Sequence, residues 1–260
     1  MEKSILSLQK ALDILCSFDF RTGGLSAQMV SKELNIPLST TYRYLKTLEE
    51  KRFLTRNLDT KRYTLGFMLF QLGNMVVSEM KFIEVLMPHM KSLSSLSGET
   101  VFLTILSGWR AVCLERIETR RLIKMSLDRG RSLPLHAGAS SKILLAYQED
   151  SFIDSMIQEV GLPKLTSNTI TKPSQLKKEL RAIREQGLAF SDQEVDLGAR
   201  AISAPIFDHK GTILGGLSVA GPRERMKKGK THQLMQLVKD SAKRASYDLG
   251  YLKVKPKNGF

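Results

Sequence analysis

The first 52 residues carry apolar side chains at the spacing of amphipathic helices. A first helix is predicted over residues 4–18, with one apolar face made of Ile5, Leu8, Leu12 and Leu15 and with Ala11 beside them. Two glycines then favour a turn, and Ser26 is suited to cap a short helix over residues 27–34. Leu25 and Val30 have the spacing of a hydrophobic staple around that cap.

A third helix is predicted over residues 37–52, and its two faces differ. Its apolar stripe contains Thr41, Leu45 and Leu48, with Tyr44 beside them. The opposite face has hydroxyl groups and two cations but no carboxylate, and is made of Ser39, Thr40, Tyr42, Arg43 and Lys46. Such short donors with an arginine suit contacts to phosphates and base edges in a major groove. Taken alone, the helix favours a merely solvated surface, because polar helix faces are common.

Two short β-prone runs, residues 53–57 and 61–65, predict a hairpin after the third helix. The hairpin carries Arg56, Lys61 and Arg62, which are placed to contact phosphates or a minor groove. A short helix, a tight turn, a longer helix and a basic hairpin make a winged helix-turn-helix, and this combination favours DNA binding. We expect a DNA-binding domain over residues 1–66.

Residues 67–80 are predicted to form a helix that is apolar almost all round. A helix of this kind must be covered on more than one side, and the N-terminal domain is too small to surround it. We therefore expect residues 67–81 to be a linker helix that packs against a second copy of the chain. Gly73 permits a close approach there.

A second domain is expected over residues 82–250, followed by a basic tail over 251–260. Apolar alternation predicts strands over residues 100–106, 111–117, 122–127, 201–207 and 212–219. Helical spacing predicts helices over residues 85–96, 139–147, 152–160, 173–186 and 232–247. Strands and helices are grouped and do not alternate regularly, which indicates an α+β fold with a mainly antiparallel sheet.

The formal net charge of +14 indicates a polyanionic partner, most simply nucleic acid. The excess of Lys and Arg lies in residues 1–66 and 223–260, whereas residues 67–222 are nearly balanced. We interpret the basic C-terminal end as a solvated tail.

No apolar run is long enough to span a membrane, and the N-terminus lacks the apolar core of a signal peptide. Cys16 and Cys113 each lie in an apolar segment, so we expect two buried free thiols and a reducing, cytoplasmic compartment. The 4 histidines are scattered, with no ligand spacing, so no metal site and no cofactor are expected.

The segment IPLSTTYRYLKTLEEKRFLTRNLDTKRYTLGFMLFQLG resembles the DNA-binding domain of IclR-type transcriptional regulators. Two positions depart from that pattern: Thr41 replaces an aliphatic residue, and Arg52 stands where glycine is common. The stretches LPLHAGASSKILLA and REQGLAFSDQEVDLGARAISAPIFDHKGTILGGLSVAGP resemble the same family's effector-binding domain, which has a GAF-like fold. The resemblance implies a homodimer or tetramer that binds an operator in double-stranded DNA and a small-molecule effector.

The small residues before the helix at 139–147 are predicted to form a loop whose free N–H groups suit a carboxylate. Ser140 or Ser141 could instead be simple helix caps, and for this segment taken alone that interpretation is favoured. The resemblance places effector contacts at Ala139, Ser140, Ser191 or Asp192, Ala201, Ser218 and Ala220. Some family members have cysteine at the position of Ala201 and serine at that of Ala220. The expected pocket is therefore less polar than theirs, and its ligand different.

No catalytic constellation is evident. Ser174 and Lys177 have S-x-x-K spacing but begin a helix, and His136 has neither a nucleophile nor an orienting group near it in sequence. We predict a DNA-binding transcriptional regulator, not an enzyme, controlled by a small metabolite such as an organic acid. An architectural DNA-binding protein without an effector and an enzyme with a catalytic C-terminal half remain the alternatives.

Overall fold

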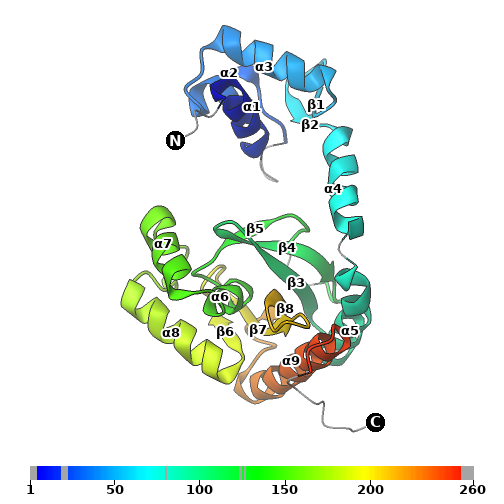
Figure 1. The fold of residues 1–260 in the computed structure, drawn as a ribbon, viewed down its shortest axis with the longest axis vertical. Helices are drawn as coiled ribbons and strands as arrows, with labels where there is room; N and C mark the ends of the chain where they lie inside the picture. The colour runs from blue at the N-terminus through cyan, green and yellow to red at the C-terminus, as the bar shows by residue number, and fades with distance from the viewer. Residues whose placement is uncertain (1–4, 19–22, 80, 123–124, 126, 253–260) are drawn as a thin grey trace. The chain divides into compact units, whose positions relative to one another are not determined.

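The computed structural model describes residues 5–18, 23–79, 81–122, 125 and 127–252. The chain divides into two compact units, Met1–Lys81 and Phe82–Phe260, called here the N-terminal and the C-terminal unit (Figure 1). Each unit has its own hydrophobic core. No helix among these described residues is long and apolar enough to cross a membrane.

The N-terminal unit has the predicted helices and wing. Its elements are α1 (Leu6–Cys16), α2 (Ala27–Glu33), α3 (Leu38–Glu50), β1 (Leu54–Arg56), β2 (Tyr63–Leu65) and α4 (Phe67–Glu79). The predicted cap of α2 is confirmed, because the Ser26 side chain accepts a hydrogen bond from the Met29 N–H at 3.2 Å. Leu25 and Val30, the expected staple, both lie in the core.

The prediction for the first helix was wrong about which face is buried. Ile14 is the buried residue of α1, while Ile5, Leu8 and Leu12 are 67%, 56% and 52% exposed. The helix carries apolar side chains on both sides, and the small core takes the Ile14 side, with Leu15 packed against it. Cys16 is exposed for the same reason, which corrects the expected buried thiol.

The start of α4 has the large uncovered apolar surface that the sequence predicted. Phe67 and Phe70 are 66% and 61% exposed, and their ring centroids lie 5.1 Å apart. The position of Gly73 is open, since a Cβ added there meets no atom within 4 Å. The N-terminal unit alone therefore does not bury this part of the helix.

The wing is joined to α3 and α4 through a tight backbone crossing. Arg52 has a φ of +62°, the left-handed conformation that favours glycine. The Gly66 N–H donates to the Phe53 carbonyl at 2.7 Å, and a Cβ on Gly66 would lie 2.2 Å from the Arg52 carbonyl oxygen. Glycine is therefore required at residue 66 by close backbone approach.

The C-terminal unit is an α+β fold around one antiparallel sheet with the strand order β5-β4-β3-β8-β7-β6. The strands are β3 (Thr100–Ser107), β4 (Arg110–Ile117), β5 (Ser132–Pro134), β6 (Ala189–Asp192), β7 (Ala199–Phe207) and β8 (Ile213–Pro222). The helices are α5 (Phe82–Ser97), α6 (Ala139–Ala146), α7 (Asp150–Val160), α8 (Pro173–Gln186) and α9 (Lys228–Asp248). The predicted fold class is confirmed.

Three details of the sheet differ from the sequence prediction. The edge strands β5 and β6 were not predicted, because three and four residues are too few for a clear alternation. The strand predicted over residues 122–127 falls partly on residues 123, 124 and 126, which lie outside the described residues; Leu122, Met125 and Leu127 belong to no strand.

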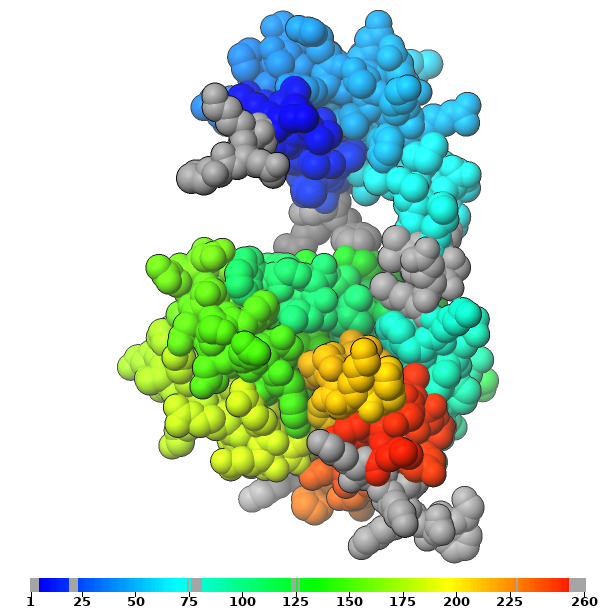
Figure 2. All heavy atoms as spheres, viewed as in Figure 1, coloured from blue at the N-terminus to red at the C-terminus, as the bar shows by residue number. Residues whose placement is uncertain are grey.

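Two helical layers cover the two faces of this sheet (Figure 1). Ile202, Ala204, Leu217 and Val219 point to one face and form a core with α5 and α9. Their neighbours along β7 and β8 point to the other face, which α6 covers together with α7 and α8. Within this unit Figure 2 shows α6–α8 in green and yellow and α9 in red, as separate groups of side chains beside the β7–β8 turn.

Gly66→Ala is expected to lower the free energy of unfolding of the N-terminal unit by about 1–3 kcal/mol, because backbone atoms must move to admit the methyl group. Denaturant unfolding of the full chain measures the loss. Gly229→Ala in α9 is the matched control, since its added Cβ meets no atom within 4 Å. Equal stability of the Gly66→Ala variant and the parent would contradict the close backbone approach.

Candidate functional site

The outer face of α3 carries the predicted DNA-contacting side chains. Ser39, Tyr42, Arg43 and Lys46 are exposed, and Thr40 is half-buried. Within the described part of the chain, none of these five side chains makes a hydrogen bond or an ion pair. They are therefore available to phosphates and base edges.

The buried face of α3 holds these side chains in position. Thr41 and Leu45 are fully buried, and Leu48 and Tyr44 pack against the same core. The Thr41 hydroxyl donates to the Pro37 carbonyl at 3.2 Å. Because this hydroxyl is hydrogen-bonded, threonine is accommodated where the family pattern has an aliphatic residue.

The wing offers two free cations and one that is partly engaged. Lys61 and Arg62 are exposed. Arg56 is half-buried, and its guanidinium lies 5.6 Å from the centre of the Tyr63 ring. Burial raises the pKa of Tyr63, so its hydroxyl is neutral at physiological pH. Lys61 and Arg62 are thus better placed for phosphates than Arg56.

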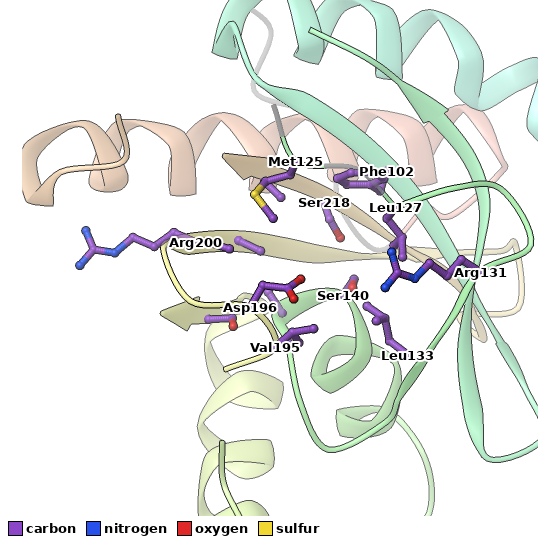
Figure 3. A pocket seen from close by; sticks show the side chains of 16 residues that line it. Phe102, Met125, Leu127, Arg131, Leu133, Ser140, Val195, Asp196, Arg200 and Ser218 are labelled. Atoms are coloured by element: carbon purple, nitrogen blue, oxygen red, sulfur yellow. The ribbon is translucent and has the colours of Figure 1, made fainter. Parts of the chain in front are cut away.

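The C-terminal unit contains a cavity of about 80 Å³ between α6 and the sheet (Figure 3). By comparison, one water molecule needs roughly 10–15 Å³, so the cavity has room for a small organic molecule. Its lining includes all the predicted effector residues except Asp192, namely Ala139, Ser140, Ser191, Ala201, Ser218 and Ala220. Segments distant in sequence therefore meet at one place.

The cavity exists because small side chains point toward α6 from the sheet. Ala201 on β7 pairs with Ala220 on β8, and Phe102 on β3 pairs with Ser218. All four line the cavity on the same face of the sheet. With only one large side chain among them, the strands leave space in front of the start of α6.

Asp192 does not line the cavity. Its Oδ2 accepts a hydrogen bond from Arg200 Nη2 at 2.7 Å, and this bond holds the pKa of the carboxyl below its usual range. Arg200 also donates to the Met226 carbonyl at 2.6 Å. In Figure 3 the Arg200 guanidinium points away from the cavity. Of the two acidic-segment candidates, only Ser191 faces the space.

The start of α6 points at the cavity with unused donors. Gly138, with a φ of +87°, precedes the helix, and the first bond along it runs from the Lys142 N–H to the Gly138 carbonyl at 3.0 Å. The N–H groups of Ala139, Ser140 and Ser141 precede that bond and have no partner one turn earlier. Together with the helix dipole, they favour an anion.

A fully buried lysine fixes the start of α6. Lys142 Nζ donates to Glu194 Oε1 at 2.6 Å, to Glu179 Oε1 at 2.9 Å and to the Phe190 carbonyl at 3.0 Å. The other oxygen of Glu194 accepts the Gly138 N–H at 3.0 Å. This cluster joins α6, α8 and the loop after β6, which forms one wall of the cavity. This cluster was not predicted from the sequence, although a lysine inside the apolar run SSKILLA indicates a buried, paired cation.

The sequence also did not predict several cavity residues. Met125, Leu127, Leu133 and Val195 are apolar members of the lining. Two charged residues, Arg131 and Asp196, come from the connection before β5 and from the loop before β7. All but Leu133 lie outside regular elements, so no periodicity could point to them.

The surroundings of His136 are those of a buried structural histidine. It is fully buried, its Nε2 donates to the Pro163 carbonyl at 2.9 Å, and burial lowers its pKa. The described residues contain no hydrogen bond from His136 to a serine or cysteine side chain, and no group of His, Cys, Asp or Glu suited to a metal ion.

Cys113 is buried as well. Burial raises the pKa of its thiol to about 12, which leaves the thiol unreactive at neutral pH.

Lys142→Met is expected to lower the free energy of unfolding by about 3–5 kcal/mol, because Glu194 stays buried without its cation. Adding Glu194→Gln should recover part of that loss. Denaturant unfolding of the three proteins measures both effects. Lys177→Met is the matched control on α8, since its ion pair with Asp154 is exposed and is expected to contribute less than about 1 kcal/mol. A loss no larger than the control's would show that the cluster does not hold α6.

Comparison with known protein families gives two matches along the chain. Residues 7–58 match the IclR helix-turn-helix domain, and residues 74–247 match the description "Bacterial transcriptional regulator IclR C-terminal". Together the matched residues include α3, with its exposed polar face, and the cavity.

Individual proteins resemble the chain over nearly its whole length. The HTH-type transcriptional repressor AllR of Escherichia coli K12 is 31% identical over 255 residues, which cover 98% of this chain and 94% of AllR. The crystal structure of Thermotoga maritima IclR is 31% identical, with a TM-score of 0.70, and the match covers 95% of this chain and 99% of that one.

A more distant structure shares the fold. It is an IclR homologue from Microbacterium hydrocarbonoxydans, complexed with 4-hydroxybenzoate, with 22% identity, a TM-score of 0.78 and coverage of 94% of this chain and 98% of that one. The family matches and the identity to AllR are decisive for classification. The chain belongs to the IclR family of DNA-binding transcriptional regulators.

Proposed function

We propose that this regulator binds its operator as a homo-oligomer and that a small organic acid in the cavity changes its affinity for DNA. The observation that carries the proposal is the cavity in front of the start of α6, where N–H groups without a helical partner meet small side chains. A protein that only packages DNA has no need of such a space.

The DNA contacts are assigned to α3 and the wing. Arg43 and Tyr42 are exposed and unpaired among the described residues, so they are suited to base edges in the major groove. Lys61 and Arg62 on the wing are suited to phosphates. Ser39, Thr40 and Lys46 complete the surface, and Arg56 supports the wing against Tyr63.

Self-association is supported by the apolar surface of the N-terminal unit. More than half of the surface is exposed at Ile5 just before α1, at Leu8 and Leu12 on α1, and at Phe67 and Phe70 on α4. Contiguous apolar surface on helices is commonly buried by a partner. A second copy of the chain is the partner we propose, since an operator-binding regulator with two recognition helices reads two half-sites.

The effector acts by preferring one arrangement of the oligomer. A ligand shifts an equilibrium only by its difference in affinity for the two states. We propose that the two arrangements differ in the spacing of the two α3 helices, and that α4 transmits the change. AllR is named a repressor, which supports repression as the regulatory effect of this chain.

Arg43→Ala is expected to weaken binding to the cognate operator by about 1–3 kcal/mol and to relax specificity at one base position. Fluorescence anisotropy with the operator and with random DNA at the same salt concentration measures both effects. Lys51→Ala, which removes an exposed cation at the end of the same helix, is the matched control. Equal losses on operator and random DNA would mean that Arg43 contacts only phosphate.

Ser140→Phe is expected to fill the cavity and abolish the response of operator binding to any effector acid. Binding to the operator without ligand should persist, because Ser140 lies in the C-terminal unit. Ser140→Ala, which keeps the space open, serves as the control and should retain a response. If Ser140→Phe responds like the parent protein, the ligand lies elsewhere.

A further inference from the structure

Arg131 is a cavity residue whose charge no other described residue matches. It lies in the connection between β4 and β5, is half-buried, and lines the cavity. Figure 3 shows its guanidinium pointing inward, toward Ser140. Among the residues that the structure describes, its guanidinium has no hydrogen-bond or ion-pair partner.

Three other arginines on β4 and in the connection to β5 have partners within the protein. The pairs are Arg110 with Ser132 at 3.1 Å, Arg116 with Glu118 at 2.7 Å and with Asp128, and Arg129 with Glu115 at 2.5 Å. Arginine stays charged in proteins, and a charge shielded from water is costly without a partner. Arg131 differs from these three in having no partner among the described residues, and from the exposed Arg120 and Arg121 in being half-buried and lining the cavity, which points to a ligand.

On the opposite wall of the cavity, an acidic residue likewise has no partner among the described residues. At the end of β6 Asp192 binds Arg200, and in the loop after β6 Glu194 binds Lys142 and the Gly138 N–H. Asp196 is exposed and lines the cavity, and in Figure 3 its carboxylate points toward Ser140. Its carboxylate has no partner in the described structure, and no ion pair joins it to Arg131.

Ser140 lies between these two charges. Its side chain is 8% exposed, its oxygen faces the cavity, and its hydroxyl makes no hydrogen bond to any described residue. The remaining lining is mostly apolar, with Phe102, Leu127 and Leu133 among its members. The site thus offers a cation, donors at a helix start, an apolar middle and an anion.

We propose that the effector is a small carboxylic acid that also carries a hydrogen-bond donor, such as a hydroxyl group, at a second position. Arg131 and the start of α6 hold the carboxylate, and Asp196 accepts the hydrogen bond from the donor. This assignment rests on the proposed sensor function and names the ligand chemistry of that same cavity. Charge-assisted hydrogen bonds are about twice as strong as neutral ones, so both contacts contribute to specificity.

The test uses two matched pairs of acids on the full chain: lactate with propionate, and 4-hydroxybenzoate with benzoate. Titration calorimetry measures the four dissociation constants. The parent protein should bind the hydroxy member of at least one pair more tightly. Arg131→Gln should weaken both members of that pair about tenfold or more. Asp196→Ala should weaken only the hydroxy member and remove the preference.

Matched controls separate these effects from a change in net charge. Arg129→Gln removes a cation from the same connection, but one that Glu115 already binds. Glu159→Ala removes an exposed carboxylate from α7. Both should bind the acids as the parent does. Arg131→Lys, which keeps the cation, should bind the carboxylate more tightly than Arg131→Gln, and a loss of folding in either variant would appear in its thermal unfolding.

Two results would overturn the inference in distinguishable ways. If Arg131→Gln and Asp196→Ala bind the acids like the parent while Ser140→Phe does not, the cavity binds acids without these two residues, and the proposed function stands. If none of the four acids binds the parent protein, the carboxylate sensor itself is contradicted.

Discussion

The alternation of side chains along β3, β7 and β8 is the constraint on which the C-terminal unit depends. Val101, Ile202 and Val219 point to α5 and α9 and form the core of that side. Their immediate neighbours Phe102, Ala201 and Ala220 point to α6 and line the cavity. A shift of one residue in register would exchange the two sets and close the cavity with branched side chains. The same pattern therefore specifies both the core and the site.

The second requirement is that α6 starts at a fixed place with free donors. Lys142 and Glu194 meet this requirement, because Glu194 binds both the lysine and the Gly138 N–H that precedes the helix. Burying an ion pair costs desolvation free energy and so adds little net stability. It can nevertheless hold a single geometry when every charge is paired. In this protein the paired charges of Lys142 and Glu194 fix the start of α6. Arg131 and Asp196, which pair with no other described residue, are the charges that we propose a ligand contacts.

An element was predicted correctly from the sequence where one strong periodicity or cap decided its structure. It was predicted wrongly where two faces of a helix were equally suited to burial. The stripe through Leu45 predicted the buried face of α3, and Ser26 predicted the start of α2. On α1, apolar residues lie on both faces, so the pattern could not tell that Ile14 is inside. The small residues of the cavity followed from family resemblance. Arg131 and Asp196 lie outside helices and strands, where their direction depends on tertiary packing.

We propose that this regulator couples a ligand in the C-terminal unit to DNA bound by the N-terminal unit. Coupling between two binding sites is reciprocal, so a ligand that changes operator affinity must have its own affinity changed by the operator by the same factor. The most direct measurement is the dissociation constant of the effector acid with and without saturating operator DNA, beside that of the operator with and without the acid. The two factors are expected to be equal and to lie in a range of about 5- to 150-fold. An acid whose affinity is the same with and without operator would contradict this proposal.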